Sequence, residues 1–310
     1  MPPPKVSILI PTRNYARYLP EALDSVLMQD FPDFEVLVAD NASTDDTPAV
    51  AAQYAARDLR IRSHRHAQDL GMARNFNWCL SQARGAYIKF LFGDDRLAAP
   101  RALGHLVTCL DVNPTVVLAG TARQVIDESS QPLEIWDNFR KPGLHRGNNV
   151  IARCLKANLN LIGEPSTVIF RKRQIEFDPA YRQLIDLDLW FRLLEIGDFF
   201  YSSDLLSNFR RHGSQQSEIN RGERIAVIEA ARLAWKHFDH CPLTPHEKSD
   251  IVFRHAHALR HHTRLNPEAL QLRREMTAWL GSTAYAAAWC RYRLSRLTRD
   301  ILKPARQSGI

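Results

Sequence analysis

Two adjacent carboxylates, Asp94 and Asp95, end an apolar run in the stretch FLFGDDRL at residues 90–97. Like charges this close together resist joint ionisation unless a positive group lies between them. Carboxylate oxygens with no Cys or His beside them in the sequence suit Mg²⁺ or Mn²⁺, which also bind diphosphate oxygens. Alternatively, acids ahead of Pro100 are typical of a helix start, where they interact favourably with the helix dipole. For an isolated pair of acids, the helix start is the better interpretation.

A third carboxylate, Asp40, follows another apolar run in the stretch FEVLVADNASTDDT. At the end of a strand, a carboxylate can accept hydrogen bonds from a nucleobase N–H or a ribose hydroxyl. The alternative is a turn that caps the next helix, and we expect Ser43 and Thr44 to have that role. Both interpretations stay open for Asp40.

The elements that position these acids follow an alternating pattern over the first 120 residues. Apolar runs alternate with segments in which apolar residues recur at helical spacing, which predicts a mainly parallel α/β sheet with helices on both faces. Ligands bind such sheets beyond the carboxyl ends of the strands. This rule selects residues 11–14, 40–46 and 93–96. The predicted strands are 6–10, 34–39, 61–64, 87–92 and 116–119, and the predicted helices are 18–29, 47–58, 72–82 and 100–110.

The rest of the chain has a different character. Residues 121–150 are polar and irregular, which indicates a loop or hairpin region, and residues 168–171 and 185–196 suggest a strand and a helix. Residues 221–310 are predicted to be all-helical. They hold 16 lysines and arginines against 8 acids, whereas the whole chain has a net charge of only +7. The basic excess therefore belongs to this C-terminal region.

The bulk composition is that of a globular protein, with 45% hydrophobic and 24% charged residues. No stretch approaches the roughly 20 apolar residues of a membrane span. The start, MPPPKVSILIPTRN, lacks the long apolar run of a signal peptide. Five scattered cysteines without a CxxC pair indicate reduced thiols, so we expect a cytoplasmic protein.

Four motifs in order produce a resemblance. The segments VSILIPTRN, VADNASTD, GMARN and FLFGDD resemble glycosyltransferase family 2, whose members have the GT-A fold, and the resemblance covers about residues 5–215. It implies a GT-A-like sheet with a C-terminal helical extension. The implied organisation is a catalytic domain over 1–220, with a nucleotide-binding half at about 1–120 and an acceptor half at about 121–220, followed by a basic helical region over 221–310.

The resemblance implies a donor site and a metal site. The donor is a nucleotide diphosphate sugar, and the implied cofactor is Mn²⁺ or Mg²⁺. The acidic motif of the family often has a further acid where this chain has Phe92. Asp95 then binds the metal beside the diphosphate, with Asp94 near the ribose or the metal. His212, in NFRRHGSQQS, is implied as an additional metal or diphosphate ligand. The implied nucleotide contacts are Pro11, Thr12, Asp40, Arg74 and Asp94.

The resemblance also implies the catalytic base. The segment LIDLDLWFRLL resembles a helix start whose Asp removes the proton of the acceptor hydroxyl, which corresponds to Asp186, with Ile185 in place of the usual Glu. Asp188 is the rival, and residues two apart cannot share one face of a helix. Either acid could instead cap the helix. A single base with in-line attack implies inversion at the anomeric carbon.

The acceptor and the partners are implied less specifically. The segment IGEPSTVIFR resembles the acceptor side of the family, with Gly163 and Glu164 as candidates. The implied acceptor is a glycan or lipid-linked glycan of bacterial-type surface assembly. Interleaved aromatic and basic residues in 221–310 suggest peripheral contact with the inner face of a membrane, with a homodimer interface or a packed helical cap as alternatives. No recognition motif for nucleic acid is present.

The same motifs bear on two other function classes. A nucleotidyltransferase is disfavoured, because the first strand ends in Pro11-Thr12 and no glycine precedes Gly71. A non-catalytic nucleotide-sugar-binding or scaffold protein of the same fold is the alternative, because Phe92 and Ile185 replace acids that are usual in the family. Four histidines in the C-terminal region include two at the i, i+4 spacing of helical metal ligands, but a solvated helix face is the better interpretation. They are His255, His257, His261 and His262.

Overall fold

The computed structural model describes residues 2–213, 215, 225–263 and 266–301. Contacts divide the chain into two compact units, Met1–Ile225 and Ala226–Ile310. None of the described helices combines the length and the apolar character that a membrane crossing requires.

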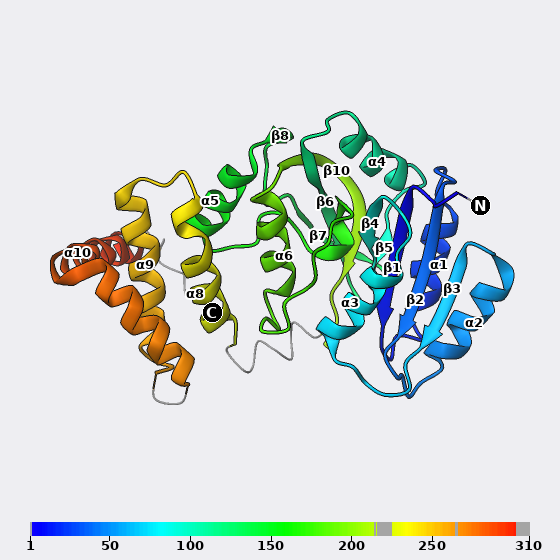
Figure 1. Cartoon of the computed structure of the whole chain (residues 1–310), viewed down its shortest axis with the longest axis horizontal. Coiled ribbons are helices and arrows are strands. Elements are labelled where there is room, and N and C mark those ends of the chain that lie inside the picture. Colours follow the sequence, from blue (N-terminus) through cyan, green and yellow to red (C-terminus); the bar gives the residue numbers. More distant parts are fainter. Residues whose placement is uncertain (1, 214, 216–224, 264–265, 302–310) are drawn as a thin grey trace, which may run out of the picture. The chain divides into compact units, whose positions relative to one another are not determined.

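The first unit is built on one sheet, which has ten strands within the described residues (Figure 1). The strand order is β3-β2-β1-β4-β9-β6-β10-β5, with β7 beside β6 and β8 beside β10. The strands are β1 (Val6–Thr12), β2 (Phe34–Asp40), β3 (Ile61–Arg65), β4 (Tyr87–Phe90), β5 (Arg96–Leu97), β6 (Val116–Ile126), β7 (Pro132–Trp136), β8 (Gly143–His145), β9 (Val168–Arg171) and β10 (Asp198–Arg210).

Strand direction brings distant residues to one edge of this sheet. β3, β2, β1 and β4 are mutually parallel. β9 runs antiparallel to both β4 and β6, and β10 runs parallel to β6. β6 and β10 therefore point the same way as β1 and β4. The carboxyl end of β10 consequently meets the edge at which β1, β2 and β4 end.

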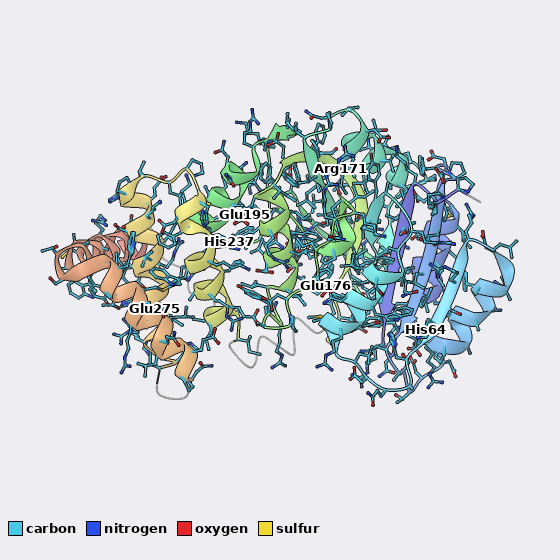
Figure 2. All side chains as sticks on the ribbon, viewed as in Figure 1. His64, Arg171, Glu176, Glu195, His237 and Glu275 are labelled. Carbon is cyan, nitrogen blue, oxygen red and sulfur yellow. The ribbon has the colours of Figure 1, made fainter. Side chains whose placement is uncertain are left out.

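Helices cover both faces, as the alternation predicted. α1 (Leu19–Leu27), α2 (Thr47–Arg57) and α4 (Ala102–Asp111) share one hydrophobic core with alternate residues of β1 and β2. On the other face, rings of α3 (Met72–Gln82) and α6 (Ile185–Leu194) pack against Phe90 and Phe170. α5 (Gly147–Ala157) contacts α6. Figure 2 labels Arg171 of β9, whose guanidinium donates to Leu110 O at 2.6 Å and fastens β9 to α4.

The predicted fold class is confirmed, with one difference in detail. The sheet is parallel from β3 to β4 and mixed beyond it. The polar segment after residue 120, predicted as a loop or hairpin region, begins with a hairpin, in which β6 continues to Ile126 and pairs with β7. Polar residues of β6 are buried there, including Thr121 and Arg123. Alternating apolar patterning therefore did not mark the second half of β6.

The second unit is helical where the structure describes it. Its elements are α8 (Ile225–His237), the short η2 (Phe238–His240), α9 (Pro245–Leu259) and α10 (Pro267–Ile301). α9 starts with a capping box, in which Thr244 and Glu247 satisfy each other's backbone N–H groups. α10 is interrupted at Gly281, whose φ of 68° is a left-handed conformation that suits glycine.

Aromatic and basic residues of the second unit interact within it. Tyr285 and Tyr292 pack against Phe253, and Arg291 pairs with Asp250 at 2.6 Å. Trp279 contacts Phe238 and stays 42% exposed. The side chains of Arg293, Arg296 and Arg299 lie outside the described residues.

The solvated helix face predicted for the four histidines of this unit is wrong for His255, which is 4% exposed. His255 is buried, and burial lowers its pKa to about 3, with the Arg254 charge acting in the same direction. His257 stacks on Phe253, and His261 accepts a hydrogen bond from Arg260. No group of three metal-binding side chains was found within the described residues.

A buried carboxylate fixes the opposite edge of the sheet, where β1 and β2 begin. Glu35 accepts hydrogen bonds from the Ser7 hydroxyl at 2.6 Å, from Arg84 Nε at 2.6 Å and from Arg62 at 3.1 Å. Ser7 Oγ in turn accepts from the Gly85 N–H. Burial alone would raise the pKa of Glu35, but Arg84 and Ser7 outweigh burial and hold this pKa below its usual value.

The pH dependence of Glu35→Gln tests this cluster. We expect the variant to lose about 2 kcal/mol of stability at pH 7, because a charge-assisted network loses its charge. Since the folded pKa is depressed, the contribution is present above the unfolded value of 4.5 and disappears as the pH falls through the folded pKa. Thermal unfolding of both proteins from pH 7 to pH 3 should therefore show the two midpoints converging.

Glu128→Gln is the matched control, because Glu128 forms an exposed ion pair with Arg17. We expect a change below about 1 kcal/mol for this control. A Glu35→Gln deficit that stays constant down to pH 3 would contradict the ionised network.

Candidate active site

The paired acids lie at the carboxyl edge of the sheet, just past β4. Asp94 and Asp95 are only 4% and 1% exposed. The N–H of Arg210, the last residue of β10, donates to Asp95 Oδ1 at 2.8 Å, and Arg210 Nε donates to the Asp94 carbonyl at 2.7 Å. The acids are therefore fixed by a strand that comes more than 100 residues later in the sequence.

The second oxygen of Asp95 is a candidate ligand atom. Asp95 Oδ2 is buried and has no hydrogen-bond partner within the described part of the chain. Burial raises the pKa of Asp95 well above its usual range, and the charge of Asp94 adds to the rise. The Ser166 hydroxyl and the Arg210 N–H act in the opposite direction. A cation at Oδ2 would satisfy this atom and favour the ionised carboxylate.

His212 contacts the other acid. His212 Nε2 lies 3.0 Å from Asp94 Oδ2, and both side chains are buried. The imidazole is held between the rings of Tyr15 and Tyr18, with centroid distances of 5.9 Å and 5.1 Å. Burial and the charges of Asp94 and Asp95 raise the pKa of Tyr15, so this phenol stays neutral. The structure thus brings the predicted His212 to the acid pair.

Gly93 is required by a close approach to the end of β1. A Cβ at Gly93 would lie 2.7 Å from Thr12 Oγ1, which is too close for a side chain. Thr12 Oγ1 is itself buried without a hydrogen-bond partner among the described residues. Pro11 precedes it in β1 and pairs with Ala39 of β2. The predicted Pro11 and Thr12 therefore lie beside the strand that ends in Asp40.

The two carboxylate oxygens of Asp40 have different environments. Its Oδ1 accepts hydrogen bonds from the backbone N–H and the hydroxyl of Ser43, as in a turn. Its Oδ2 accepts no hydrogen bond within the described residues and lies 3.4 Å from Arg65 Nε at the exposed rim. Thr44 instead donates its N–H to Asn14. One oxygen of Asp40 is therefore engaged in a turn, and the other faces an arginine.

Arg74 lies apart from these contacts. It is exposed in the first turn of α3 and makes no hydrogen bond or ion pair with any described residue. The preceding loop is fastened to the end of β2, since Asn41 donates to Asp69 at 2.6 Å and accepts from the Leu70 N–H. Nearby, His64 of β3 (Figure 2) stacks on Trp78 of α3.

The two acids of α6 have different environments. Asp186 is half-buried in the first turn, where its Oδ2 accepts a hydrogen bond from Asn160 at 3.2 Å. Asp188 is fully buried and pairs with Arg192 at 2.7 Å. Of the two, Asp188 is occupied by a partner on its own helix, whereas Asp186 is partly accessible.

Asn160 links Asp186 to the acceptor-side candidates. The Asn160 amide contacts the Gly163 carbonyl and also accepts from the Gly163 N–H. Gly163 has a φ of 131°, and Glu164 follows it. Glu164 pairs with the buried Arg123 of β6 at 2.8 Å, and its charge also acts on Asp95. Contacts therefore connect Asp186 through Asn160 to Gly163, the neighbour of Glu164, and the charge of Glu164 raises the pKa of Asp95.

Phe92, in place of a third acid, joins an aromatic cluster. Its ring stacks on Phe76 of α3 with a centroid distance of 5.4 Å, and Phe76 also packs against Phe177. Its N–H donates to the Ser166 hydroxyl at 3.0 Å. The position thus contributes packing rather than charge.

Three polar groups of the site were absent from the sequence-based prediction. Arg210 stood inside a quoted motif without a role, Lys89 stood inside an apolar run, and Arg123 stood in a segment predicted as a loop or hairpin region. All three are almost fully buried. A charged residue within a predicted strand was the one available signal, and it applied to Lys89.

The donor set is compatible with Mg²⁺ or Mn²⁺, although the described residues contain no cluster of three metal-binding side chains. These ions usually bind through one or two carboxylates together with phosphate oxygens and water. The unpartnered Asp95 Oδ2 and the neighbouring Asp94 supply such a pair. His212 is already hydrogen-bonded to Asp94, so in this arrangement it orients that acid.

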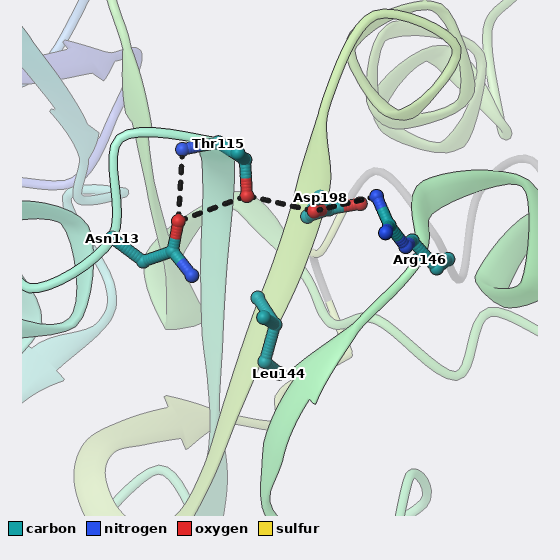
Figure 3. Close-up of a pocket in the computed structure, with 5 residues that line it drawn as sticks. All are labelled: Asn113, Thr115, Leu144, Arg146 and Asp198. Atoms are coloured by element: carbon teal, nitrogen blue, oxygen red, sulfur yellow. Dashed lines mark hydrogen bonds and ion pairs between the residues drawn. The ribbon is translucent and has the colours of Figure 1, made fainter.

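A separate pocket of about 290 Å³ lies away from these residues (Figure 3). Asp198, the first residue of β10, accepts a hydrogen bond from the Thr115 hydroxyl at 2.7 Å within it. Because β6 and β10 begin there, the pocket lies at the edge opposite the acid pair. It is lined by Asn113, Thr115, Leu144, Arg146 and Asp198.

Comparisons with known proteins agree with this architecture. An uncharacterized protein of Mycobacterium tuberculosis, MT1568, is 32% identical over 255 residues, which are 78% of this chain and 78% of that protein. An uncharacterized glycosyltransferase of Rickettsia typhi, RT0329, is 27% identical over 243 residues, 76% of this chain and 71% of its own length.

Solved structures share the fold. S. aureus TarS 1-349 in complex with UDP-GlcNAc has a TM-score of 0.61 and 20% identity, covering 84% of this chain and 73% of that one. The mannosyltransferase PcManGT from Pyrobaculum calidifontis, in complex with GDP-Man and Mn²⁺, has a TM-score of 0.58 and 19% identity, covering 95% and 81%. The family model described as "Glycosyl transferase family 2" matches residues 7–173, more than half of the chain. The chain therefore belongs to glycosyltransferase family 2 and is a glycosyltransferase.

Proposed function

We propose that this enzyme transfers a sugar from a nucleotide diphosphate donor to a hydroxyl acceptor, with inversion and with the help of Mn²⁺ or Mg²⁺. The observation that carries the proposal is the buried Asp94–Asp95 pair, with an unpartnered oxygen, at the carboxyl edge of the sheet. Two solved structures of the same fold, S. aureus TarS and PcManGT, are complexes with UDP-GlcNAc and with GDP-Man and Mn²⁺. The alternative, a non-catalytic nucleotide-sugar-binding protein, keeps the same donor site.

The proposed donor contacts follow the ends of the strands. Pro11 and Thr12 border the nucleobase, and Asp40 Oδ2, which accepts no hydrogen bond from a described residue and lies 3.4 Å from Arg65 Nε, accepts from the base or the ribose. Arg74, exposed and without a protein partner in the described part of the chain, contacts the base or the phosphates. This assignment is supported by the position of each residue at a strand end or at the start of α3.

In this proposal Asp95 and Asp94 hold the cation, and His212 orients Asp94. A bound divalent cation would offset the charge that develops on the leaving diphosphate. The protein prepares for this role by burying both acids and fixing their backbone through Arg210. Fixed groups cost no reorganisation when the charge develops.

Asp186 is the proposed base, which takes the proton of the attacking hydroxyl. Its partial exposure and its hydrogen bond to Asn160 leave it oriented but accessible. One base and in-line attack give inversion at the anomeric carbon, without the covalent intermediate of retaining enzymes. Gly163 and Glu164 form the proposed acceptor side.

The proposed acceptor is a glycan or a lipid-linked glycan of bacterial-type surface assembly, and the proposed location is cytoplasmic with peripheral contact at the inner membrane face. The basic excess of residues 221–310 supports contact with anionic lipid. The part-exposed Trp279 and Trp289 are consistent with such a contact. A homodimer through the same region is the alternative.

A donor panel tests the enzymatic proposal against the binding alternative. UDP-, GDP- and dTDP-sugars are offered with Mn²⁺, in the presence of simple glycosides as acceptors. Transfer or donor hydrolysis with an inverted anomeric product is the expected result. Saturable donor binding without turnover across the panel would favour the non-catalytic alternative.

Removal of the metal should abolish turnover in the same assay. We expect EDTA to lower the rate by about 100-fold or more, with full recovery on adding Mn²⁺, because the leaving diphosphate then lacks its counter-charge. Asp95→Asn should show a similar loss, together with weaker binding of Mn²⁺ measured by isothermal titration calorimetry. Turnover that persists in EDTA would remove Asp95 from its proposed role.

Asp186→Asn separates catalysis from binding. We expect the rate of transfer to fall by about 100-fold or more, within the range of general-base contributions, with donor affinity changed little. Asp204→Asn, a carboxylate that is 43% exposed and pairs with His105, is the matched control and should retain wild-type rates. Lost donor binding in Asp186→Asn would indicate a structural residue instead.

A further inference from the structure

Lys89 is a fully buried lysine on the strand that leads to the acid pair. Its ammonium donates to three backbone carbonyls, those of Phe90 at 2.8 Å, Ser166 at 2.6 Å and Pro165 at 3.4 Å. An ammonium has three N–H donors, so these acceptors match its full hydrogen-bonding capacity. Lys89 is therefore buried as a satisfied polar group.

The three carbonyls belong to two segments that are distant in sequence. Phe90 ends β4, five residues before Asp95, whereas Pro165 and Ser166 begin the 3₁₀ turn η1 (Pro165–Thr167). This turn directly follows Glu164. Lys89 therefore joins the strand of the acid pair to the turn of the acceptor-side candidate.

Ser166 extends the same connection on both sides. Its hydroxyl accepts from the Phe92 N–H at 3.0 Å, which lies between Lys89 and Asp94 in the chain. Its carbonyl, besides accepting from Lys89, accepts from the Ser207 hydroxyl of β10 at 2.8 Å. The turn is thus fixed by β4 and β10 together, the two strands that also fix the acids.

An apolar residue would fill this position at a lower cost than a lysine. Burying an ammonium is unfavourable because it loses its hydration. Burial lowers the pKa of Lys89 to about 7, while the Asp95 charge opposes that change. Replacing buried charges with apolar residues is often neutral or stabilising. Stability alone therefore does not explain the lysine.

We propose that Lys89 is a positioning residue, which holds the turn at Pro165–Thr167 against β4 and thereby sets the distance between Glu164 and the Asp94–Asp95 pair. The inference rests on the proposed glycosyl transfer, in which donor and acceptor groups must be aligned. Misplacement of reacting groups by about 1 Å can lower a rate by about 100-fold. Lys89 itself contacts no reacting atom.

Two substitutions separate the hydrogen bonds from mere filling of space. Lys89→Met keeps the length and removes every donor, whereas Lys89→Gln keeps an N–H donor group without charge. Tyr87→Phe is the matched control, because Tyr87 lies on the same strand and its hydroxyl bonds to Asp111 rather than to η1. All variants are made in the full chain.

The first measurement is amide hydrogen exchange, which requires no substrate. In Lys89→Met we expect exchange in peptides covering residues 162–168 to be about tenfold faster, since the hydrogen bonds from Lys89 to this turn are lost. Lys89→Gln should be closer to wild type, and Tyr87→Phe should leave these peptides unchanged. Unchanged exchange in Lys89→Met would overturn the proposal.

The second measurement is the kinetics of transfer in the donor assay. We expect Lys89→Met to lower kcat about 10- to 100-fold while the Kd of the free nucleotide UDP or GDP stays within about threefold, with partial recovery in Lys89→Gln. Equal kcat values for Lys89→Met and wild type would contradict the inference.

If Lys89→Met does not fold, the same comparison between Lys89→Gln and wild type decides. Failure of the wild-type enzyme to transfer any sugar would instead contradict the proposed function, and the exchange result would stand separately.

Discussion

The candidate site depends on one buried guanidinium. Arg210 is completely buried at the end of β10, where it donates to the carbonyls of Asp94 and Asp127, the Ser130 hydroxyl and the carboxylate of Glu21. Burial alone would raise the pKa of Glu21, but Ser130 and Arg210 outweigh it and lower this pKa. Arg210 thus connects α1, the β6–β7 turn and the acid pair.

This interaction exists because of the topology of the sheet. β10 reaches the edge where β4 ends only because β9 reverses direction between β4 and β6, so that β6 and β10 run parallel to β4. β10 also pairs with the two-residue β5, which directly follows Asp95. The acids therefore lie between two strands of the same sheet, and their backbone is held on both sides before any ligand arrives.

The sequence was sufficient for the parts that depend on local pattern. Apolar alternation located the strand ends, and the rule for parallel sheets then selected Asp40, Asp94 and Asp95 from a chain with 34 acids. The hydrogen-bond partners of these acids could not be predicted in this way. The hydrogen bond between Arg210 and Asp95 spans 115 positions, and the register of β10 against β6 shifts at bulges near Ser202 and Leu205. No local pattern encodes such a register, because a shift of one residue reverses every side chain.

Because long-range contacts cannot be predicted from local pattern, some buried polar residues were assigned to a loop or hairpin region and others were given no role. Thr121 and Arg123 made the second half of β6 look polar, yet the pairing of Arg123 with Glu164 allows the strand to be buried. The resemblance favoured Asp186 and kept Asp188 as its rival, and the structure pairs Asp188 with Arg192, one helical turn later. Predicting these residues requires knowing what each charge contacts, which is a property of the assembled sheet.

The absence of a third acid is consistent with this assembled arrangement. Phe92 packs on Phe76, so the position adds no negative charge to a pair that is already difficult to ionise. Two carboxylates are enough for a cation that also binds phosphate oxygens and water. The buried positive groups Arg210 and Lys89 hold the backbone around the acids rather than neutralising them, since neither side chain bonds to the unpartnered oxygen of Asp95. That oxygen is therefore left for a ligand, in a site whose donors are fixed in advance.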